Sequence, residues 1–273
     1  MTGEWVSSGC AAETGTPPQL WRAGSLLERS AQHVDAFLTL SQFCADNHTA
    51  FGFSEPMRVV PTFLPDSERA QPPAPLAPED ANGRPYFLFV GRLEKIKGLQ
   101  DVIPLFRGDG AADLVIAGTG VYEAELRALA AGSPRVRFLG MQPMEKLRSL
   151  YANAVAAVMP SICYEVFPMV VLEAFREATP IVARRLGPFP DIVAASGGGL
   201  LFDTPAELKA AIDALTVDAG QRAKLGAAAA HAFEARWSED VALTEYFTLI
   251  RNLAEQKGET ELVARLIAGS GGE

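Results

Sequence analysis

The sequence contains little cysteine and histidine, and their positions exclude several common kinds of site. Three cysteines, Cys10, Cys44 and Cys163, lie far apart and are odd in number. Such a set does not build a disulfide framework, so we expect a reduced protein of the cytoplasm. The three histidines have no metal-ligand spacing with these cysteines. We therefore expect no zinc site. We also expect no cofactor.

Long basic runs and long apolar runs are also missing. The net charge is −9 and Lys and Arg are scattered, so nucleic acid is not expected as a partner. No stretch reaches the roughly 18–20 apolar residues that span a bilayer. The N-terminal residues MTGEWVSSGCAAETGTPP lack the basic and apolar regions of a secretory signal. We expect a cytoplasmic protein, either free or peripheral to a membrane.

What the sequence does contain is a regular alternation of apolar strands and helices, beginning at Tyr86. Hydrophobic residues make up 48% of the chain, which is typical of a globular core. Strands are predicted at 86–90, 113–117, 136–139, 155–160, 180–183 and 199–202. Helices are predicted at 99–106, 122–131, 144–153, 168–178 and 205–215. This order predicts an α/β fold with a doubly wound, mainly parallel, Rossmann-like sheet. Ligands of such sheets bind at the carboxyl ends of the strands.

The segments outside this sheet divide the chain into four predicted parts. Residues 1–61 form a small, incomplete α/β piece, and 62–85 form a linker that contains six of the seven prolines between Pro61 and Pro85. Residues 86–218 form the sheet domain. Residues 219–273 form C-terminal helices that cross back toward the first part. The small piece is expected to contain a helix at 25–33, a strand at 34–40, a helix at 41–50 and a strand at 57–61. The C-terminal helices are expected at 221–237, 238–252 and 260–267.

The stretch SICYEVFPMVVLEAF, residues 161–175, places two acids around the start of an apolar helix. Pro168 suits the first helical position, which puts Glu165 in the preceding turn. Side chains of a helix lean toward its N-terminus, so Glu173 reaches back toward that turn. A helix N-terminus favours phosphate, and hydroxyls suit carboxylates, so the pair indicates a nucleotide-sugar site. The alternative is a structural ion pair with Arg176 or Arg184.

Other candidate residues follow the earlier strands. Gly91 permits a tight turn after the first strand, and Arg92 and Lys97 could hold a diphosphate or be ordinary surface cations. Gly118 lies in AGTG, which does not match the GxGxxG dinucleotide fingerprint but lets the backbone approach a ligand or a neighbouring loop. Met141 follows the third strand and suits either a nucleobase or the core.

Together, GRxxxxKG (91–98), AGxG (117–120) and ExxxxxxxE (165–173) occur in this order on successive strand ends. This set resembles the donor-binding domain of retaining glycosyltransferase family 4, the group 1 enzymes with the GT-B fold. The resemblance implies transfer of a sugar from a nucleotide-diphosphate sugar to an acceptor, with retention of configuration and without metal. It implies that Arg92 and Lys97 hold the diphosphate and that Glu165, the catalytic candidate, contacts sugar hydroxyls.

The resemblance further implies that Glu173 holds the ribose and that the backbone around Phe167 and Met169 approaches the sugar and phosphate. Val166 and Pro168 stand where the family has glycines, and Ala178 also replaces a glycine. In GPFPD, residues 187–191, one glycine and Asp191 replace the usual two glycines and a glutamate.

Only the last strand–helix–strand of the family's first domain is recognisable, at about 34–61. We therefore expect a truncated or fragmentary chain, inactive alone, or a chain covered by a second chain or a second copy. The side chains expected to lack much of their partner surface are Phe233, Trp237, Leu243, Tyr246, Phe247 and Ile250. The acceptor is not predicted. The alternative function is a non-catalytic module that binds a nucleotide or nucleotide sugar. A related sugar-nucleotide epimerase is disfavoured by EVFPMVVLE.

Overall fold

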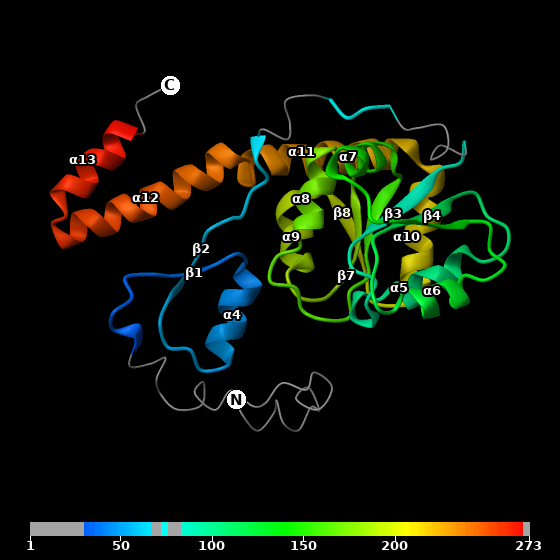
Figure 1. The fold of residues 1–273 in the computed structure, drawn as a ribbon, viewed down its shortest axis with the longest axis horizontal. Coiled ribbons are helices and arrows are strands. Elements are labelled where there is room, and N and C mark those ends of the chain that lie inside the picture. Colours follow the sequence, from blue (N-terminus) through cyan, green and yellow to red (C-terminus); the bar gives the residue numbers. More distant parts are fainter. Residues whose placement is uncertain (1–29, 67–71, 76–82, 270–273) are drawn as a thin grey trace. The chain divides into compact units, whose positions relative to one another are not determined.

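The computed structural model describes residues 30–66, 72–75 and 83–269 of the 273-residue chain (Figure 1). The chain forms two compact units. One consists of Met1–Val60 with Phe247–Glu273, and the other of Pro61–Tyr246. The C-terminal segment thus belongs to the same unit as the N-terminal piece. The predicted helix at 25–33 lies largely outside the described residues.

The large unit contains a six-stranded sheet with the order β5-β4-β3-β6-β7-β8, in which every neighbouring pair is parallel. The strands are β3 (Tyr86–Val90), β4 (Asp113–Ala117), β5 (Val136–Gly140), β6 (Ala156–Met159), β7 (Ile181–Arg184) and β8 (Gly199–Phe202). All six were predicted from the sequence. The predicted doubly wound α/β fold class is confirmed.

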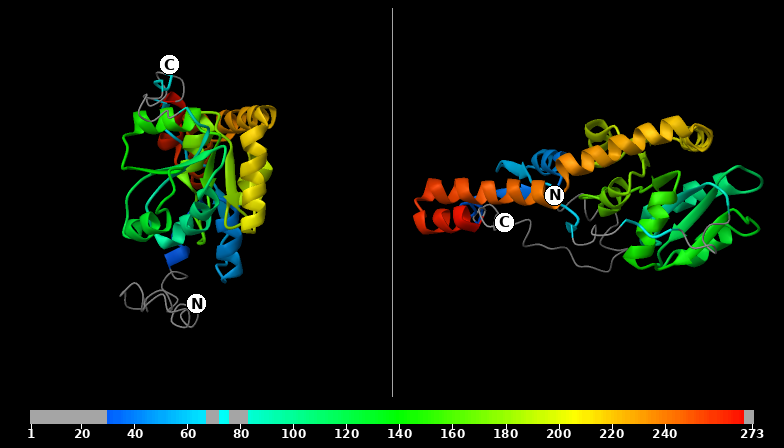
Figure 2. Two further views of the ribbon diagram at one scale, coloured as in Figure 1. Left: turned by 90° about the vertical axis from the view of Figure 1, so that its right-hand side faces the viewer. Right: turned by 90° about the horizontal axis from the view of Figure 1, so that it is seen from above.

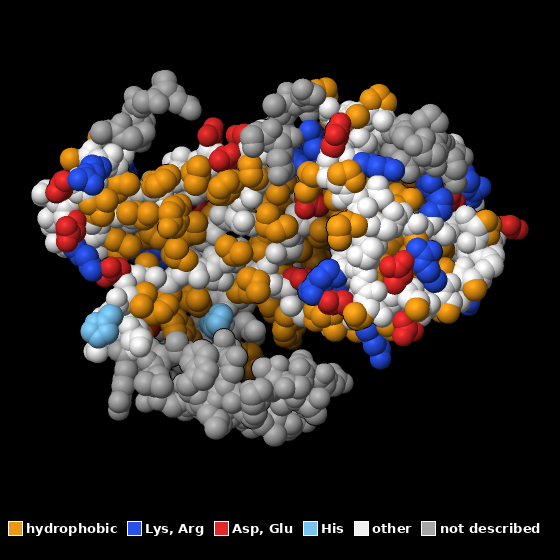
Figure 3. Space-filling view, in the orientation of Figure 1, with side chains coloured by type: hydrophobic (Ala, Val, Ile, Leu, Met, Phe, Trp, Pro, Cys, Tyr) orange, Lys and Arg blue, Asp and Glu red, His pale blue; other side chains and the backbone are white. Residues whose placement is uncertain are grey.

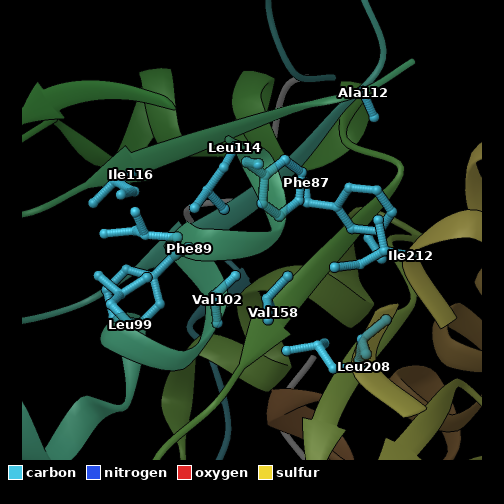
Figure 4. Close-up of a cluster of buried hydrophobic side chains, with 14 of the residues drawn as sticks. Phe87, Phe89, Leu99, Val102, Ala112, Leu114, Ile116, Val158, Leu208 and Ile212 are labelled. Atoms are coloured by element: carbon cyan, nitrogen blue, oxygen red, sulfur yellow. The ribbon is translucent and has the colours of Figure 1, made fainter. Parts of the chain in front are cut away.

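Apolar side chains cover both faces of this sheet because its strands are almost continuously hydrophobic. Side chains alternate along β3, so Phe87 and Phe89 belong to one hydrophobic cluster and Tyr86 and Leu88 to the other. The first cluster packs under α5, α6 and α10, and Figure 4 shows its side chains from β3, β4, β6, α5 and α10. The second packs under α7, α8, α9 and α11 (Figure 2).

The helices of the large unit mostly follow the sequence prediction. They are α5 (Leu99–Val102), α6 (Glu123–Leu129), α7 (Met144–Asn153), α8 (Met169–Arg176), α9 (Phe189–Ser196), α10 (Pro205–Val217) and α11 (Ala219–Arg236). Two differences have local causes. The helix predicted over 99–106 becomes 3₁₀ from Ile103 to Phe106, where Pro104 lacks an N–H for the α-helical ladder. Helix α9 was not predicted. It begins with Pro188 at its N-cap and Pro190 in its first turn, where the missing N–H of proline breaks no helical hydrogen bond.

The small unit contains a two-stranded parallel sheet of β1 (Phe37–Thr39) and β2 (Met57–Val59), connected by α4 (Gln42–Ala50). Ser41 is the N-cap of α4, since its Oγ accepts a hydrogen bond from the amide of Cys44. The unit also includes α13 (Thr260–Gly269) and the part of α12 (Glu239–Lys257) from Phe247 onward. Lys257 forms an ion pair with Asp35 at 2.5 Å.

The C-terminal helices correct one expectation. Phe233 and Trp237 were expected to lack much of their partner surface, but both are buried in the second cluster of the large unit. The centroid of the Trp237 ring lies 5.9 Å from that of Phe175, in α8, and 6.1 Å from that of Phe167, just before α8. The start and the end of α8 therefore supply the surface on which Trp237 packs. Tyr246 and Phe247 are exposed, and Figure 3 shows hydrophobic side chains gathered along α12.

The described part of the Pro-rich segment contains no helix or strand longer than a single 3₁₀ residue. Leu64 of this segment is nevertheless buried in the second cluster, so the chain at 61–66 is not a free tether. The proposed linker limits of 62–85 stay a prediction. Among the helices that the structure describes, none is both long enough and apolar enough to cross a membrane.

Candidate functional site

The connections of the sheet reverse direction between β3 and β6. From β3 the chain proceeds outward to β4 and β5, and it then returns to pair β6 with the other side of β3. In open α/β sheets, ligands bind in the crevice that this reversal leaves at the carboxyl ends of the two strands. The loops after β3 and β6 are therefore the first place to look for a site.

Backbone contacts hold these two loops together. The amide of Ile162 donates to the carbonyl of Ile96 at 2.9 Å. Gly98 has φ 77°, and a Cβ placed on it would overlap the carbonyl oxygen of Pro160, at the end of β6. Only glycine satisfies both the positive φ and the lack of space. The close approach fixes the short 3₁₀ turn Lys95–Lys97 against the β6 loop.

Lys97 and Glu165 meet at this point. Lys97 Nζ lies 2.6 Å from Glu165 Oε1, and the two side chains are 20% and 19% exposed. Ser161, which is buried, donates its hydroxyl to the same carboxylate oxygen at 2.8 Å. A partly buried, charge-assisted pair is better ordered than a surface pair. The structure thus brings together two predicted site residues that are far apart in the sequence.

Arg92 lies differently from Lys97, although both were predicted to hold a diphosphate. Its side chain is 72% exposed and pairs with Glu94 at 2.7 Å. The exposed guanidinium has rotamer freedom to move toward an anion, whereas Lys97 is already held. That Arg92 and Lys97 together hold a diphosphate stays a prediction.

Gly91, after β3, and Gly118, after β4, approach each other closely through their backbones. Gly91 and Gly118 have φ of 154° and 142°, and a Cβ on Gly118 would overlap the carbonyl oxygen of Gly91. The amide of Leu93 also donates to the carbonyl of Thr119 at 2.9 Å. AGTG therefore packs against the neighbouring loop, which was the second of its two predicted uses. Met141, just after β5, is 79% exposed and so does not belong to the core.

Helix α8 begins at Met169, one residue later than predicted, and Pro168 occupies the N-cap position without a side-chain cap. Phe167 packs partly into the second cluster. Met169 is 37% exposed, and its sulfur accepts a hydrogen bond from Thr62 at 3.7 Å. No side chain of the N-cap residue therefore occupies the first amides of α8, the groups that a helix N-terminus offers to phosphate.

Glu173 lies inside α8 and contacts α7 instead of Lys97. The hydroxyl of Tyr151 donates to Glu173 Oε2 at 2.9 Å. Burial, together with the negative charge of Glu173, raises the pKa of the Tyr151 phenol well above its ordinary value. Arg184, one of two cations considered as structural partners of these acids, pairs with Asp101 at 2.5 Å.

Three residues that support the site were missed in the sequence. Ser161 follows β6 directly, four residues before Glu165, and this spacing could have indicated its contact. Gly187 has φ 60°, and a Cβ on it would lie 3.5 Å from the amide of Glu165. No sequence pattern indicated Tyr151, because its contact with Glu173 depends on how α7 packs against α8.

In the part of the chain that the structure describes, no three His, Cys, Asp or Glu side chains cluster as metal ligands do.

A family model for glycosyl transferases group 1 matches residues 76–232, which is more than half of the chain. The chain belongs to the group 1 glycosyltransferases. The match contains every strand of the large sheet, the loops after β3 and β6, and α8. The predicted family is confirmed at this level.

Curated glycosyltransferases resemble the chain over part of their length. It is 33% identical over 166 residues to a D-inositol 3-phosphate glycosyltransferase of Corynebacterium diphtheriae, covering 55% of this chain and 39% of that protein. It is 34% identical over 152 residues to a glycogen synthase of Thermus thermophilus, covering 48% of this chain and 35% of that protein. The chain thus spans about two fifths or less of the length of these relatives.

Several solved structures share the fold of this chain. A sucrose-phosphate synthase from Thermosynechococcus elongatus has a TM-score of 0.66 at 22% identity, covering 82% of this chain and 59% of that chain. Anabaena HepE in complex with UDP-glucose has a TM-score of 0.66 at 19% identity, covering 83% of this chain and 64% of that chain. A protein solved with a nucleotide sugar thus has the same fold as this chain.

Proposed function

We propose that the chain binds a nucleotide-diphosphate sugar at the carboxyl ends of β3 and β6, as the donor half of a retaining glycosyltransferase. The single observation that carries the proposal is the Lys97–Glu165 pair, which lies at the reversal point of the sheet in a group 1 family domain. A protein of similar fold has been solved with UDP and with UDP-glucose.

In this proposal each side chain has one task. Lys97 leaves Glu165 in part and neutralises the diphosphate, whose negative charge grows as the bond between sugar and phosphate breaks. Glu165, freed on one oxygen, accepts hydrogen bonds from sugar hydroxyls and so orients the reacting carbon. Arg92 moves from its exposed position onto the diphosphate, and Glu173 accepts from the ribose hydroxyls. The acceptor hydroxyl attacks from the face that the diphosphate leaves.

Three predicted backbone or apolar contacts complete the donor site. The backbone at Phe167 and Met169 meets the sugar and phosphate at the start of α8. Gly91 and Gly118 allow the loops after β3 and β4 to approach the donor. The exposed Met141 side chain is available to a nucleobase. The proposal includes no metal, because Arg92 and Lys97 neutralise the negative charge of the diphosphate.

Calorimetry with UDP, GDP, ADP and their glucose derivatives tests the proposal. One nucleoside diphosphate is expected to bind, and Lys97→Ala to weaken that binding more than tenfold, because a charged hydrogen bond contributes roughly 1.5–3 kcal/mol. Glu173→Ala should weaken it by a similar factor. Lys95→Ala is the matched control, since Lys95 lies on the same 3₁₀ turn but is exposed. Binding of none of these ligands would refute the donor site.

The alternative proposal is a module that binds the nucleotide sugar without transferring it. The contacts described for Lys97 and Glu165 serve binding as well as transfer, so binding data alone do not separate the two. A donor-hydrolysis assay separates them. Release of free sugar from the bound donor supports the enzyme, and tight binding without any release supports the module.

A further inference from the structure

The hydroxyl of Tyr151 is the buried titratable group that the proposed function leaves without a task. The side chain is fully buried among apolar residues of the second cluster. A phenylalanine would fill that volume equally well, and a buried hydroxyl costs free energy unless it has a partner. The partner it has is a carboxylate oxygen of Glu173, on the neighbouring helix, at 2.9 Å.

The backbone around Tyr151 is held at several points, so the position of its ring is well defined. Thr179 Oγ1 donates to the carbonyl of Tyr151 at 2.7 Å, and the hydroxyl of Tyr86 donates to the carbonyl of Leu150 at 2.6 Å. These bonds fasten the end of α7 to β3 and to the turn before β7. The phenol is therefore a rigid donor rather than a mobile one.

The side chain of Glu173 is intrinsically flexible. It has three side-chain torsions, and it is only half-buried between the buried residues Leu172 and Ala174 of α8. A carboxylate offers about four lone-pair sites. One strong bond from a fixed phenol to Oε2 selects one rotamer of the side chain and sets the plane in which Oε1 lies.

We propose that Tyr151 is the positioning residue for Glu173, and that this pair sets the preference of the site for ribonucleotides over 2′-deoxyribonucleotides. The inference rests on the proposed function, in which Glu173 accepts from the ribose hydroxyls. A ribose has two neighbouring hydroxyls that reach a carboxylate only when its oxygens lie in a defined plane. Without the 2′-hydroxyl, a carboxylate held in that plane loses a charged hydrogen bond.

The raised pKa of the Tyr151 phenol is consistent with this role, because the hydroxyl stays protonated and donates throughout the neutral range. The nearby Tyr86 provides a matched control. Its hydroxyl also belongs to a side chain buried in the second cluster and also donates a hydrogen bond, but to the backbone carbonyl of Leu150. Tyr86→Phe therefore removes a comparable bond without touching Glu173.

The experiment measures the dissociation constants of UDP, 2′-deoxy-UDP and inorganic pyrophosphate for the wild type, Tyr151→Phe and Tyr86→Phe. The wild type is expected to prefer UDP over 2′-deoxy-UDP by about tenfold. Tyr151→Phe should reduce this ratio at least threefold, while pyrophosphate binding stays unchanged. Tyr86→Phe should keep the wild-type ratio, and thermal unfolding checks that both variants are folded.

Each outcome decides something. An unchanged ratio in folded Tyr151→Phe would overturn the positioning role while leaving the donor site intact. Equal loss of the ratio in Tyr86→Phe would make the effect a general one of core packing and would also overturn it. If the wild type binds neither pyrophosphate nor UDP, nor any of the other nucleoside diphosphates, the proposed function fails and the inference fails with it. Should another base be preferred, its ribo- and 2′-deoxyribonucleotide replace the UDP pair.

Discussion

Lys97 and Glu165 are 68 positions apart in the chain, yet their Nζ and Oε1 atoms lie 2.6 Å from each other. The pair joins the loop after β3 to the loop after β6, which are the two strands on either side of the reversal point of the sheet. A cation and an acid are thus both held at the edge of the sheet where we propose that this chain binds its donor.

The first prediction separates the sugar from the nucleotide. Glu165→Gln should weaken binding of a UDP-sugar about tenfold relative to UDP, because the sugar is the only part of the donor that the carboxylate contacts in the proposal. The weaker pair with Lys97 affects both ligands alike and cancels in the ratio. The ratio of the two dissociation constants is measured by calorimetry. Glu94→Gln, an acid on the loop after β3 that pairs with Arg92, should leave the ratio unchanged. An equal loss for UDP and its sugar would contradict the role of Glu165.

The second prediction concerns Gly98. Ala at this position combines a positive φ with an overlap on the carbonyl of Pro160. Gly132 has the same φ of 77° but open space around its Cβ position. Gly132→Ala should cost about 1 kcal/mol through backbone strain alone, and Gly98→Ala roughly 1–3 kcal/mol more. Urea unfolding measures both, and equal losses would mean that the β6 loop moves aside freely.

The third prediction is that Ala178→Gly stabilises the protein. Ala178 is, among the described residues, the only one other than glycine with a positive φ, at 55°. The family's glycine at this position fits that conformation without strain. Relief of strain, less the added freedom of glycine in the unfolded chain, should raise the free energy of unfolding by about 0.5–1 kcal/mol. A lower midpoint in urea for the glycine variant would disprove the strain.

The fourth prediction uses the raised pKa of Tyr151. Above about pH 10 the unfolded phenol loses its proton while the folded one keeps it, so the folded state binds more protons and stability falls as pH rises. Between about pH 10 and 11 the wild type should lose about 1 kcal/mol more than Tyr151→Phe. Urea unfolding at the two pH values gives the difference. Parallel losses in both proteins would show that the phenol ionises normally.

The sequence was sufficient to predict the sheet, because its strands are short apolar runs separated by helical patterns. β3, β4 and β8 begin and end where predicted. Helix α9 was not predictable in the same way, since Pro188 and Pro190 suggest a turn until the packing of Phe189 and Ile192 is known. Local pattern therefore fixed the order of the elements, and tertiary packing decided the exceptions.

The candidate site was predictable only in part. Lys97 and Glu165 could be brought to one edge of the sheet by counting strands, since carboxyl ends of parallel strands share an edge. The burial of Trp237 was wrongly judged, because no sequence pattern shows that Phe167 and Phe175 cover it. The bond between Tyr151 and Glu173 joins two helices whose facing sides depend on packing.

The fastening of Ile96 and Gly98 to the end of β6 has a thermodynamic consequence for any ligand of Lys97. Ordering a mobile loop and a lysine side chain on binding would cost several kcal/mol of conformational entropy. Here the chain has lost most of that entropy when it folds, because Lys97 is already held by Glu165, which in turn accepts a hydrogen bond from Ser161. A diphosphate then replaces Glu165 as the partner of a lysine that is already ordered. The changes in heat capacity and entropy on binding should therefore come from the release of water and not from the folding of a loop.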